Sequence, residues 1–411
     1  MSKTVYDYMD WPEIEAVVYG EETAPRDVMG PRLTPDGVLI QGFFPEARAA
    51  AVVTGRTKYE MELEDEAGYY AVLIPGRRIP DYEFQVEFEK ETKNFKDAYA
   101  FGRLLTEEDE RAFLGGVYYE AYKKMGAHPM VMNGVAGTHF AVWAPNAVRV
   151  RVVGEFKMSG LFELFIPGVK AGDAYRYEIK AKGDVLLQKA DPYGNRTQPA
   201  PLWNSVVADV SDFIWNDSSW MAERKKYDDR RQPVSIYETS LGQWKSGKEL
   251  VAFAKEKGYT HVELHPVMEF LEDGSDGYPT SAYFAVSTRY GTPADFAALV
   301  DELHQVGIGV ILDWSPAQFP RYAGGLEKFD GTPLYEVKDP EMAVHPMWGT
   351  MLYNYDSPMV MDFLISNACF WLEVFHVDGL RMDDVDAMLY LDYGRKDGWT
   401  PNMYGSNENL P

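Results

Sequence analysis

The first half of the sequence contains an internal repeat, and this repeat constrains the fold more than any other feature. Residues 37–53 read GVLIQGFFPEARAAAVV, and residues 137–153 read GTHFAVWAPNAVRVRVV. Each copy combines an alternating strand, a turn that contains proline and a β-branched strand, and an aromatic strand ending in Ile-Pro-Gly follows each copy. The repetition predicts two tandem β-sandwich modules, which we place at residues 1–115 and 116–228.

The two copies differ in length. Thirty residues separate Pro45 from Pro75, but only twenty-two separate Pro145 from Pro167. We therefore expect the second module to be shortened between the strings GEFKMSG and LFELF. Between the modules, LLTEEDERAFLGG predicts a short acidic helix with Thr106 as its N-cap.

From residue 229 onward, strands alternate with helices. The predicted strands cover residues 234–238, 260–264, 309–313 and 377–383, and helices are predicted at 248–257, after Thr292 and after Ser357. Repetition of this kind predicts right-handed βαβ units and a parallel sheet. We expect residues 229–411 to form the first half, strands one to four, of a (β/α)8 TIM barrel. The whole chain is then a multidomain protein of the β plus α/β class.

Charge and composition narrow the class of partner. The 64 acidic and 40 basic residues give a net charge of −24, which disfavours binding to nucleic acid and to anionic lipid surfaces. A neutral substrate fits this charge better, and the 27 tyrosines and 10 tryptophans suit sugar rings as well as core packing. Cys369 is the only cysteine, no apolar run is long enough for a membrane span, and the amino terminus lacks an apolar signal segment. We therefore expect a cytoplasmic protein.

Polar residues stand at the ends of two predicted barrel strands, where barrel enzymes place their chemistry. The third strand ends at Asp313, and the fourth ends in Arg381-Met382-Asp383-Asp384. Arg381 and Asp383 are two residues apart and share one face of a strand, whereas Asp384 faces the opposite way. A neighbouring arginine favours an ionised carboxylate, which is what a nucleophile for glycosyl transfer needs. An ion pair on the barrel rim with a purely structural role is the alternative.

Several long strings carry a family resemblance. They are DGLRMDDVDAMLYLDYGRKDG at the fourth strand, ILDWSPAQFPRYAGG at the third, THVELHPVMEF and DGYPTSAYFAVSTRYGTPADF at the second, and GAHP and FAVWAPNA in the second module. These strings resemble those of bacterial glycogen branching enzymes, members of the α-amylase superfamily, and the resemblance runs through nearly the whole chain. It implies an enzyme that transfers segments of α-1,4-glucan to a 6-hydroxyl group and so forms α-1,6 branches.

The resemblance also implies roles for individual residues. Asp383 corresponds to the covalent nucleophile of a retaining double displacement, and Arg381 corresponds to the residue that orients it. Four further residues correspond to positions that contact or support the substrate: Asp313, Tyr278, Gln318 and Trp314. The chemistry implied by the family requires neither a metal ion nor an organic cofactor, and the implied partner is an α-1,4-glucan.

Other positions depart from the family pattern. The general acid/base glutamate of the family has no match in these 411 residues, so we expect this chain by itself to be inactive. Gln318 stands where the family has histidine, and Asp384 and Asp386 add negative charge beside Asp383. Two other functions therefore stay open: a non-catalytic α-glucan-binding fragment, and a related hydrolase that debranches glucan or releases trehalose. The sequence does not indicate an oligomeric state.

Overall fold

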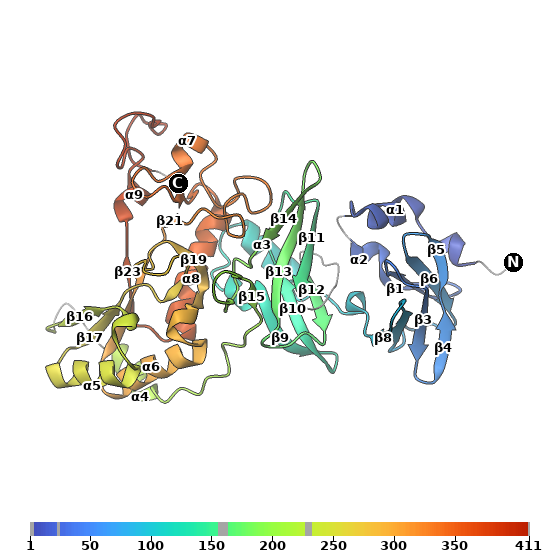
Figure 1. The fold of residues 1–411 in the computed structure, drawn as a ribbon, viewed down its shortest axis with the longest axis horizontal. Helices are drawn as coiled ribbons and strands as arrows, with labels where there is room; N and C mark the ends of the chain where they lie inside the picture. Colours follow the sequence, from blue (N-terminus) through green and yellow to red (C-terminus); the bar gives the residue numbers. More distant parts are fainter. Residues whose placement is uncertain (1–3, 23–24, 155–162, 227–231, 410–411) are drawn as a thin grey trace.

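The computed structural model describes residues 4–22, 25–154, 163–226 and 232–409. Three parts follow one another along the longest axis of the molecule, with the first module at one end, the second in the middle and the α/β region at the other end (Figure 1). This arrangement confirms the predicted class of fold. The predicted shortening of the second module lies at residues 155–162, outside the described residues.

The first module is a sandwich of two antiparallel sheets. One sheet has the order β1 (Gly30–Thr34), β2 (Gly37–Phe43), β6 (Tyr69–Ile74), β5 (Glu62–Asp65), and the other has the order β4 (Thr57–Glu60), β3 (Ala49–Thr54), β7 (Glu83–Glu87), β8 (Thr92–Phe95). The short helices η1 (Val5–Tyr8), α1 (Trp11–Tyr19) and α2 (Pro25–Val28) precede them. Strand β2 is apolar on both faces because Val38 and Ile40 pack inside the sandwich while Leu39 packs against Val5 of η1.

The second module repeats the strand pairing of the first. Its strands are β9 (Gly126–Met132), β10 (Val135–Ala141), β11 (Arg149–Gly154), β12 (Glu163–Pro167), β13 (Ala174–Ala181), β14 (Val185–Lys189) and β15 (Ser205–Val206). The pairs β2–β6 and β3–β7 of the first module correspond to β10–β12 and β11–β13 of the second. The internal repeat predicted from the sequence is therefore confirmed as a repeat of structure.

The segment between the modules contains η2 (Ala98–Ala100), α3 (Glu107–Leu114) and η3 (Ala121–Lys123). The predicted cap of α3 is confirmed: the hydroxyl of Thr106 accepts a hydrogen bond from the backbone N–H of Asp109, and the Asp109 carboxylate accepts one from the backbone N–H of Thr106. This reciprocal arrangement satisfies two backbone donors that a helix start leaves free.

The α/β region has the strand order of the beginning of a barrel. Its parallel strands are β16 (Ile236–Thr239), β17 (His261–Leu264), β20 (Gly309–Trp314) and β23 (Gly379–Met382), and neighbours in the sheet are neighbours along the chain. Within the described residues the sheet stays open. Strand β16 begins two residues later than expected, and β23 is shorter than expected at both ends.

Helices connect the parallel strands as expected. They are α5 (Gly247–Lys257), α6 (Pro293–Gln305) and α8 (Pro358–Val374), with the smaller α4 (Ser218–Arg224), α7 (Pro340–Ala343), α9 (Val385–Leu389), η4 (Leu241–Gln243) and η5 (Thr288–Tyr290). Two short antiparallel pairs complete the region: β18 (Met268–Phe270) with β19 (Thr280–Val286), and β21 (Gln318–Phe319) with β22 (Met351–Leu352). Helix α6 starts at the predicted N-cap Thr292, and α5 ends at Gly258, whose φ of 76° suits glycine.

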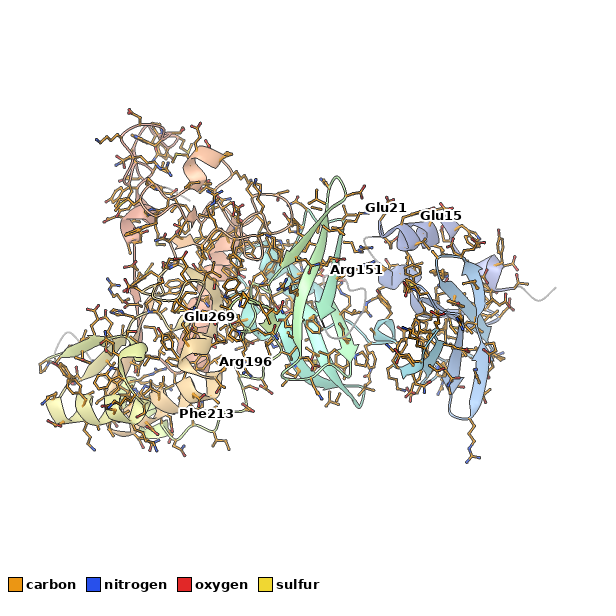
Figure 2. All side chains as sticks on the ribbon, in the orientation of Figure 1. Glu15, Glu21, Arg151, Arg196, Phe213 and Glu269 are labelled. Carbon is orange, nitrogen blue, oxygen red and sulfur yellow. The ribbon has the colours of Figure 1, made fainter. Side chains whose placement is uncertain are left out.

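One hydrophobic core joins the second module to the α/β region. Buried residues of both parts belong to a single cluster, which includes Val150 of β11, Leu312 of β20 and Trp371 of α8. Polar contacts cross the same boundary, because the hydroxyl of Ser366 in α8 accepts a hydrogen bond from the backbone N–H of Tyr122. Glu269 also lies at this boundary (Figure 2). No helix in the described part of the chain is long and apolar enough to cross a lipid bilayer.

Candidate functional site

The carboxyl ends of the parallel strands bring ionisable side chains together. Glu238 lies in β16, Glu263 in β17, Asp313 in β20 and Arg381 in β23. Asp383 follows the last of these strands directly. Because parallel strands end at one edge of the sheet, residues that are far apart in the sequence meet there, as in barrel enzymes generally.

Arg381 is the centre of this cluster. Its Nη1 atom donates to Oδ2 of Asp313 and to Oδ1 of Asp383, at 3.2 Å in each case. The hydroxyl of Tyr278 donates to the same oxygen of Asp313, and Nε of Arg381 lies 3.6 Å from a carboxylate oxygen of Glu263. Four of the six residues singled out in the sequence, namely Asp313, Tyr278, Arg381 and Asp383, therefore lie in direct contact.

The members of the cluster differ in their exposure. The side chain of Asp313 is fully buried, whereas that of Asp383 is 28% exposed and that of Arg381 is 43% exposed. The guanidinium group therefore holds an accessible carboxylate with one N–H while a buried carboxylate anchors it. An oriented, accessible carboxylate of this kind is the arrangement that nucleophilic catalysis requires.

Burial also shifts the protonation of two neighbours. The pKa of Tyr278 is raised by burial and by its hydrogen bond to the Asp313 carboxylate, so its hydroxyl stays protonated as a donor. The pKa of Glu263 is raised by burial first and then by the negative charges of Asp313 and Glu238. Three carboxyl groups, those of Glu238, Glu263 and Asp313, therefore lie close together in this cluster.

Asp384 contacts other partners than Arg381, as expected, although it lies beyond the end of β23 in a left-handed conformation with a φ of 57°. Its Oδ2 atom accepts a hydrogen bond from Nε2 of Gln318 at 3.0 Å and lies 3.0 Å from Nε2 of His345. Nδ1 of His345 accepts from the backbone N–H groups of Met347 and Trp348, which leaves Nε2 as the nitrogen that carries the proton. Burial first, and then the charges of neighbouring aspartates, raise the pKa of Asp384 to about 6.

Gln318 and Trp314 lie outside the exposed part of the cluster. Gln318 is 4% exposed, and its amide is held at both ends, because Oε1 accepts a hydrogen bond from the hydroxyl of Thr350 while Nε2 donates to Asp384. The indole N–H of Trp314 donates to Oδ1 of Asn367 at 2.9 Å within the core. The structure therefore does not bring these two side chains to the surface that a ligand would reach.

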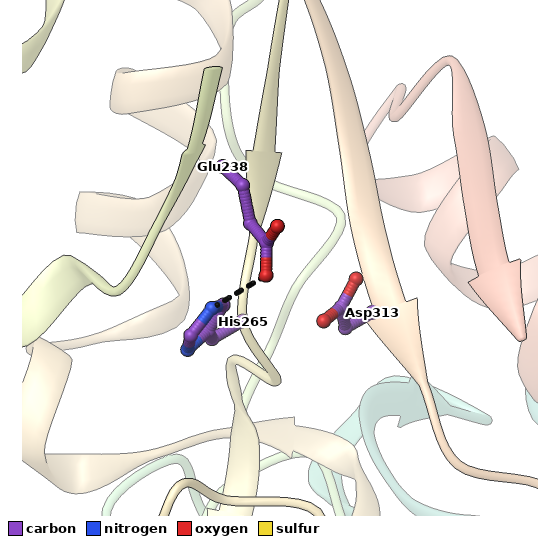
Figure 3. A group of neighbouring side chains, drawn as sticks. All are labelled: Glu238, His265 and Asp313. Carbon is purple, nitrogen blue, oxygen red and sulfur yellow. Dashed lines mark hydrogen bonds and ion pairs between the residues drawn. The ribbon is translucent and has the colours of Figure 1, made fainter. Parts of the chain in front are cut away.

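Three polar residues near the site escaped the sequence reasoning. Glu238 and His265 stand at or just after strand ends and could have been found by the same rule that found Asp313. His345 carries no such signal, because it lies in a long connection between β20 and α8. Among the described residues, one group has the spacing of metal ligands: Glu238, His265 and Asp313, with ligand atoms within 4.8 Å of one another (Figure 3).

Three families of domains match the chain. Residues 10–99 match the N-terminal domain of the alpha-1,4-glucan branching enzyme GlgB. Residues 124–194 match carbohydrate-binding module 48, described as the isoamylase N-terminal domain, and residues 216–316 match the alpha amylase catalytic domain. These matches fall on the first module, the second module and the beginning of the α/β region.

Curated relatives match nearly the whole chain. The 1,4-alpha-glucan branching enzyme GlgB of Saccharophagus degradans is 42% identical over 432 residues, and that of Rubrobacter xylanophilus is 43% identical over 425 residues. Each alignment covers 97% of this chain and 59% of the relative, so the chain spans somewhat more than half the length of these relatives. The chain therefore carries a branching-enzyme N-terminal domain, a carbohydrate-binding module 48 and an α-amylase catalytic domain in part, and it is a relative of the bacterial 1,4-alpha-glucan branching enzymes.

Proposed function

We propose that these residues belong to a 1,4-α-glucan branching enzyme of glycogen biosynthesis that acts in the cytoplasm. The observation that carries the proposal is the accessible carboxylate of Asp383, held by Arg381, which is in turn anchored on buried Asp313. The high negative charge of the chain agrees with a neutral polysaccharide as substrate. The domains are proposed to be residues 1–115, 116–228 and 229–411.

The proposed reaction is a double displacement with retention. The Asp383 carboxylate attacks the anomeric carbon, and the bond to the leaving glucan oxygen breaks as that oxygen takes up a proton. The 6-hydroxyl of an acceptor chain then attacks the glycosyl ester, loses its proton and frees Asp383. Asp313 and Tyr278 support the reacting sugar in this proposal.

Arg381 keeps the nucleophile ionised and oriented in both steps. Gln318 and Trp314 act as positioning residues, since their polar atoms are engaged with Asp384, Thr350 and Asn367.

A glycosyl fluoride tests the role of Asp383 without a general acid, because fluoride leaves without being protonated. Incubation with 5-fluoro-α-glucosyl fluoride is expected to attach one fluoroglucosyl group to Asp383, read by mass spectrometry of the digested chain. Asp383→Asn is expected to prevent labelling. Asp184→Asn, a change at an exposed carboxylate of the second module, should leave it intact. Labelling of another carboxylate, or no labelling, would contradict the proposed nucleophile.

The 411-residue polypeptide is proposed to bind α-glucan without branching it. The family's proton donor has no match in these residues, and loss of a general acid costs about 10²–10⁴-fold in rate. We expect slower migration in native gels that contain glycogen, and no loss of iodine staining when the polypeptide is mixed with amylose. Free migration would contradict binding. A falling iodine stain would contradict inactivity, and release of reducing ends would favour the hydrolase alternative.

A further inference from the structure

Glu238, His265 and Asp313 lie at the ends of three adjacent strands and surround a common point (Figure 3). Nε2 of His265 and Oε1 of Glu238 are 3.1 Å apart, and one carboxylate oxygen of Asp313 completes a set of atoms within 4.8 Å of one another. Because β16, β17 and β20 are hydrogen bonded in register, the sheet holds the three backbones at fixed separations. One imidazole and two carboxylates make a mixed nitrogen and oxygen donor set.

One carboxylate oxygen of Asp313 is buried without a hydrogen-bond donor, although buried polar atoms normally have partners. The residue is fully buried, and its Oδ2 atom accepts hydrogen bonds from Tyr278 and Arg381. Oδ1 is buried as well and receives no hydrogen bond from any of the described residues. A buried carboxylate oxygen without a donor is costly unless a cation or a proton reaches it.

The charge around this point also favours a cation. Glu263 adds a third carboxylate close to those of Glu238 and Asp313, and Arg381 contacts the carboxylates of Glu263 and Asp313. Arg381 binds the Asp313 oxygen other than Oδ1, so it leaves that oxygen open. The side chains of Glu238 and His265 are 60% and 27% exposed, so an ion from solvent can reach these two ligands.

We propose that Glu238, His265 and Asp313 form a binding site for a divalent first-row transition metal, of which Zn²⁺ is the best match. Three protein ligands and one position left for water are a common arrangement of zinc sites that are not closed by a fourth protein ligand. On binding, the hydrogen bond between His265 and Glu238 breaks, Nε2 turns its lone pair to the ion, and any proton on that nitrogen is released. The inference rests on these side chains alone and does not depend on the proposed branching activity.

The test is calorimetric titration of the metal-free 411-residue chain with ZnCl₂. We expect one ion per chain with a preference for Zn²⁺ over Mg²⁺, because imidazole is a poor ligand for Mg²⁺. Mutation of a residue that only hydrogen bonds to a metal ligand weakens metal binding about 10–100-fold. Loss of a ligand itself should have at least this effect, so His265→Gln and Glu238→Gln are each expected to weaken zinc binding at least tenfold. His128→Gln and Glu256→Gln change the same residue types outside the cluster and are expected to bind zinc like the parent chain.

Cobalt gives a second readout of the same site. Co²⁺ is expected to produce a visible absorption band of a four-coordinate ion in the parent chain and in both controls, but not in His265→Gln. Circular dichroism spectra of all variants establish that they are folded. Zinc binding that is equally tight in His265→Gln and Glu238→Gln, or no binding up to millimolar zinc, would overturn the proposal. Failure of the fluoride labelling experiment would leave these results unchanged.

Discussion

Glu269→Ala is expected to lower the free energy of unfolding by about 3–5 kcal/mol, the cost of breaking a buried ion pair by removing one partner. Glu269 is 1% exposed and accepts five hydrogen bonds. The donors are the hydroxyls of Thr197 and Ser287 at 2.8 and 2.9 Å, the backbone N–H groups of Phe270 and Thr288 at 3.2 and 2.9 Å, and Nη1 of Arg289 at 2.7 Å. Alanine would leave all five donors without this acceptor.

The same carboxylate links two parts of the molecule. Thr197 lies between β14 and β15 of the second module, whereas Arg289 lies in η5 of the α/β region. The other carboxylate partner of Arg289, Asp273, is 87% exposed and compensates little for the loss.

Urea unfolding followed by circular dichroism and tryptophan fluorescence measures the effect. Glu269→Gln, which keeps one acceptor oxygen, is expected to fall between the parent and the alanine variant. Glu256→Ala, at an exposed ion pair, serves as the control. A loss below about 1 kcal/mol for Glu269→Ala would show that water replaces the carboxylate at this boundary.

His304→Leu is expected to lower the free energy of unfolding by about 3 kcal/mol or more, because it too removes the partner of buried charged groups. The imidazole is fully buried at the end of α6, with Nδ1 2.9 Å from Asp217 and Nε2 3.0 Å from Asp378. Asp378 also accepts a hydrogen bond from the backbone N–H of Val310 at the start of β20. The network therefore ties α4, α6, β20 and β23 together at the end of the sheet opposite to the candidate site.

The pH dependence of this second effect follows from the two aspartates. Burial alone would raise their pKa values, but the hydrogen bonds to His304 and its neighbours outweigh burial and lower the pKa of both Asp217 and Asp378. Carboxylates with a lowered pKa in the folded state contribute stability above their ordinary pKa, near 4, and this contribution is lost as the pH falls through the lowered values.

The difference in unfolding free energy between parent and His304→Leu is therefore expected to be fully present above about pH 5 and to shrink as the pH falls below about 4. Urea unfolding at several pH values measures it. His128→Leu, which removes a partly buried histidine that contacts a backbone carbonyl, is the control. If the difference in unfolding free energy does not change with pH, the destabilisation comes from altered packing and not from the aspartates that have lost their histidine partner.

Local patterns in the sequence predicted most of the fold. The repeat around Pro45 and Pro145 predicted the duplicated strand pairs, and alternation of strands with helices predicted the parallel sheet. Helix ends were predicted at Thr106, Thr292 and Gly258 because caps depend on residues within one turn of the chain. The start of β16 was missed by two residues, since strand ends depend on which neighbours pair with them.

Part of the candidate site could be predicted in the same way. The strand-end rule indicated Asp313, Arg381 and Asp383. Asp384 was expected to point away from them by strand alternation, whereas in the structure it lies beyond β23 in a left-handed conformation at the start of α9. The contact between Gln318 and Asp384 could not be predicted, because it depends on how the connection between β20 and α8 folds back over the strand ends.

Sequence alone determined the order of modules, the class of each module and the residues that stand at the ends of the barrel strands, because these follow from short periodic patterns. Only the tertiary structure revealed that Glu269 and His304 are buried with charged partners, since a sequence pattern assigns ionisable residues to the surface by default. The tertiary structure also decided that Glu238 and His265 lie close to the carboxylate of Asp313. These residues come from different strands, and the register of the parallel sheet sets the distance between them.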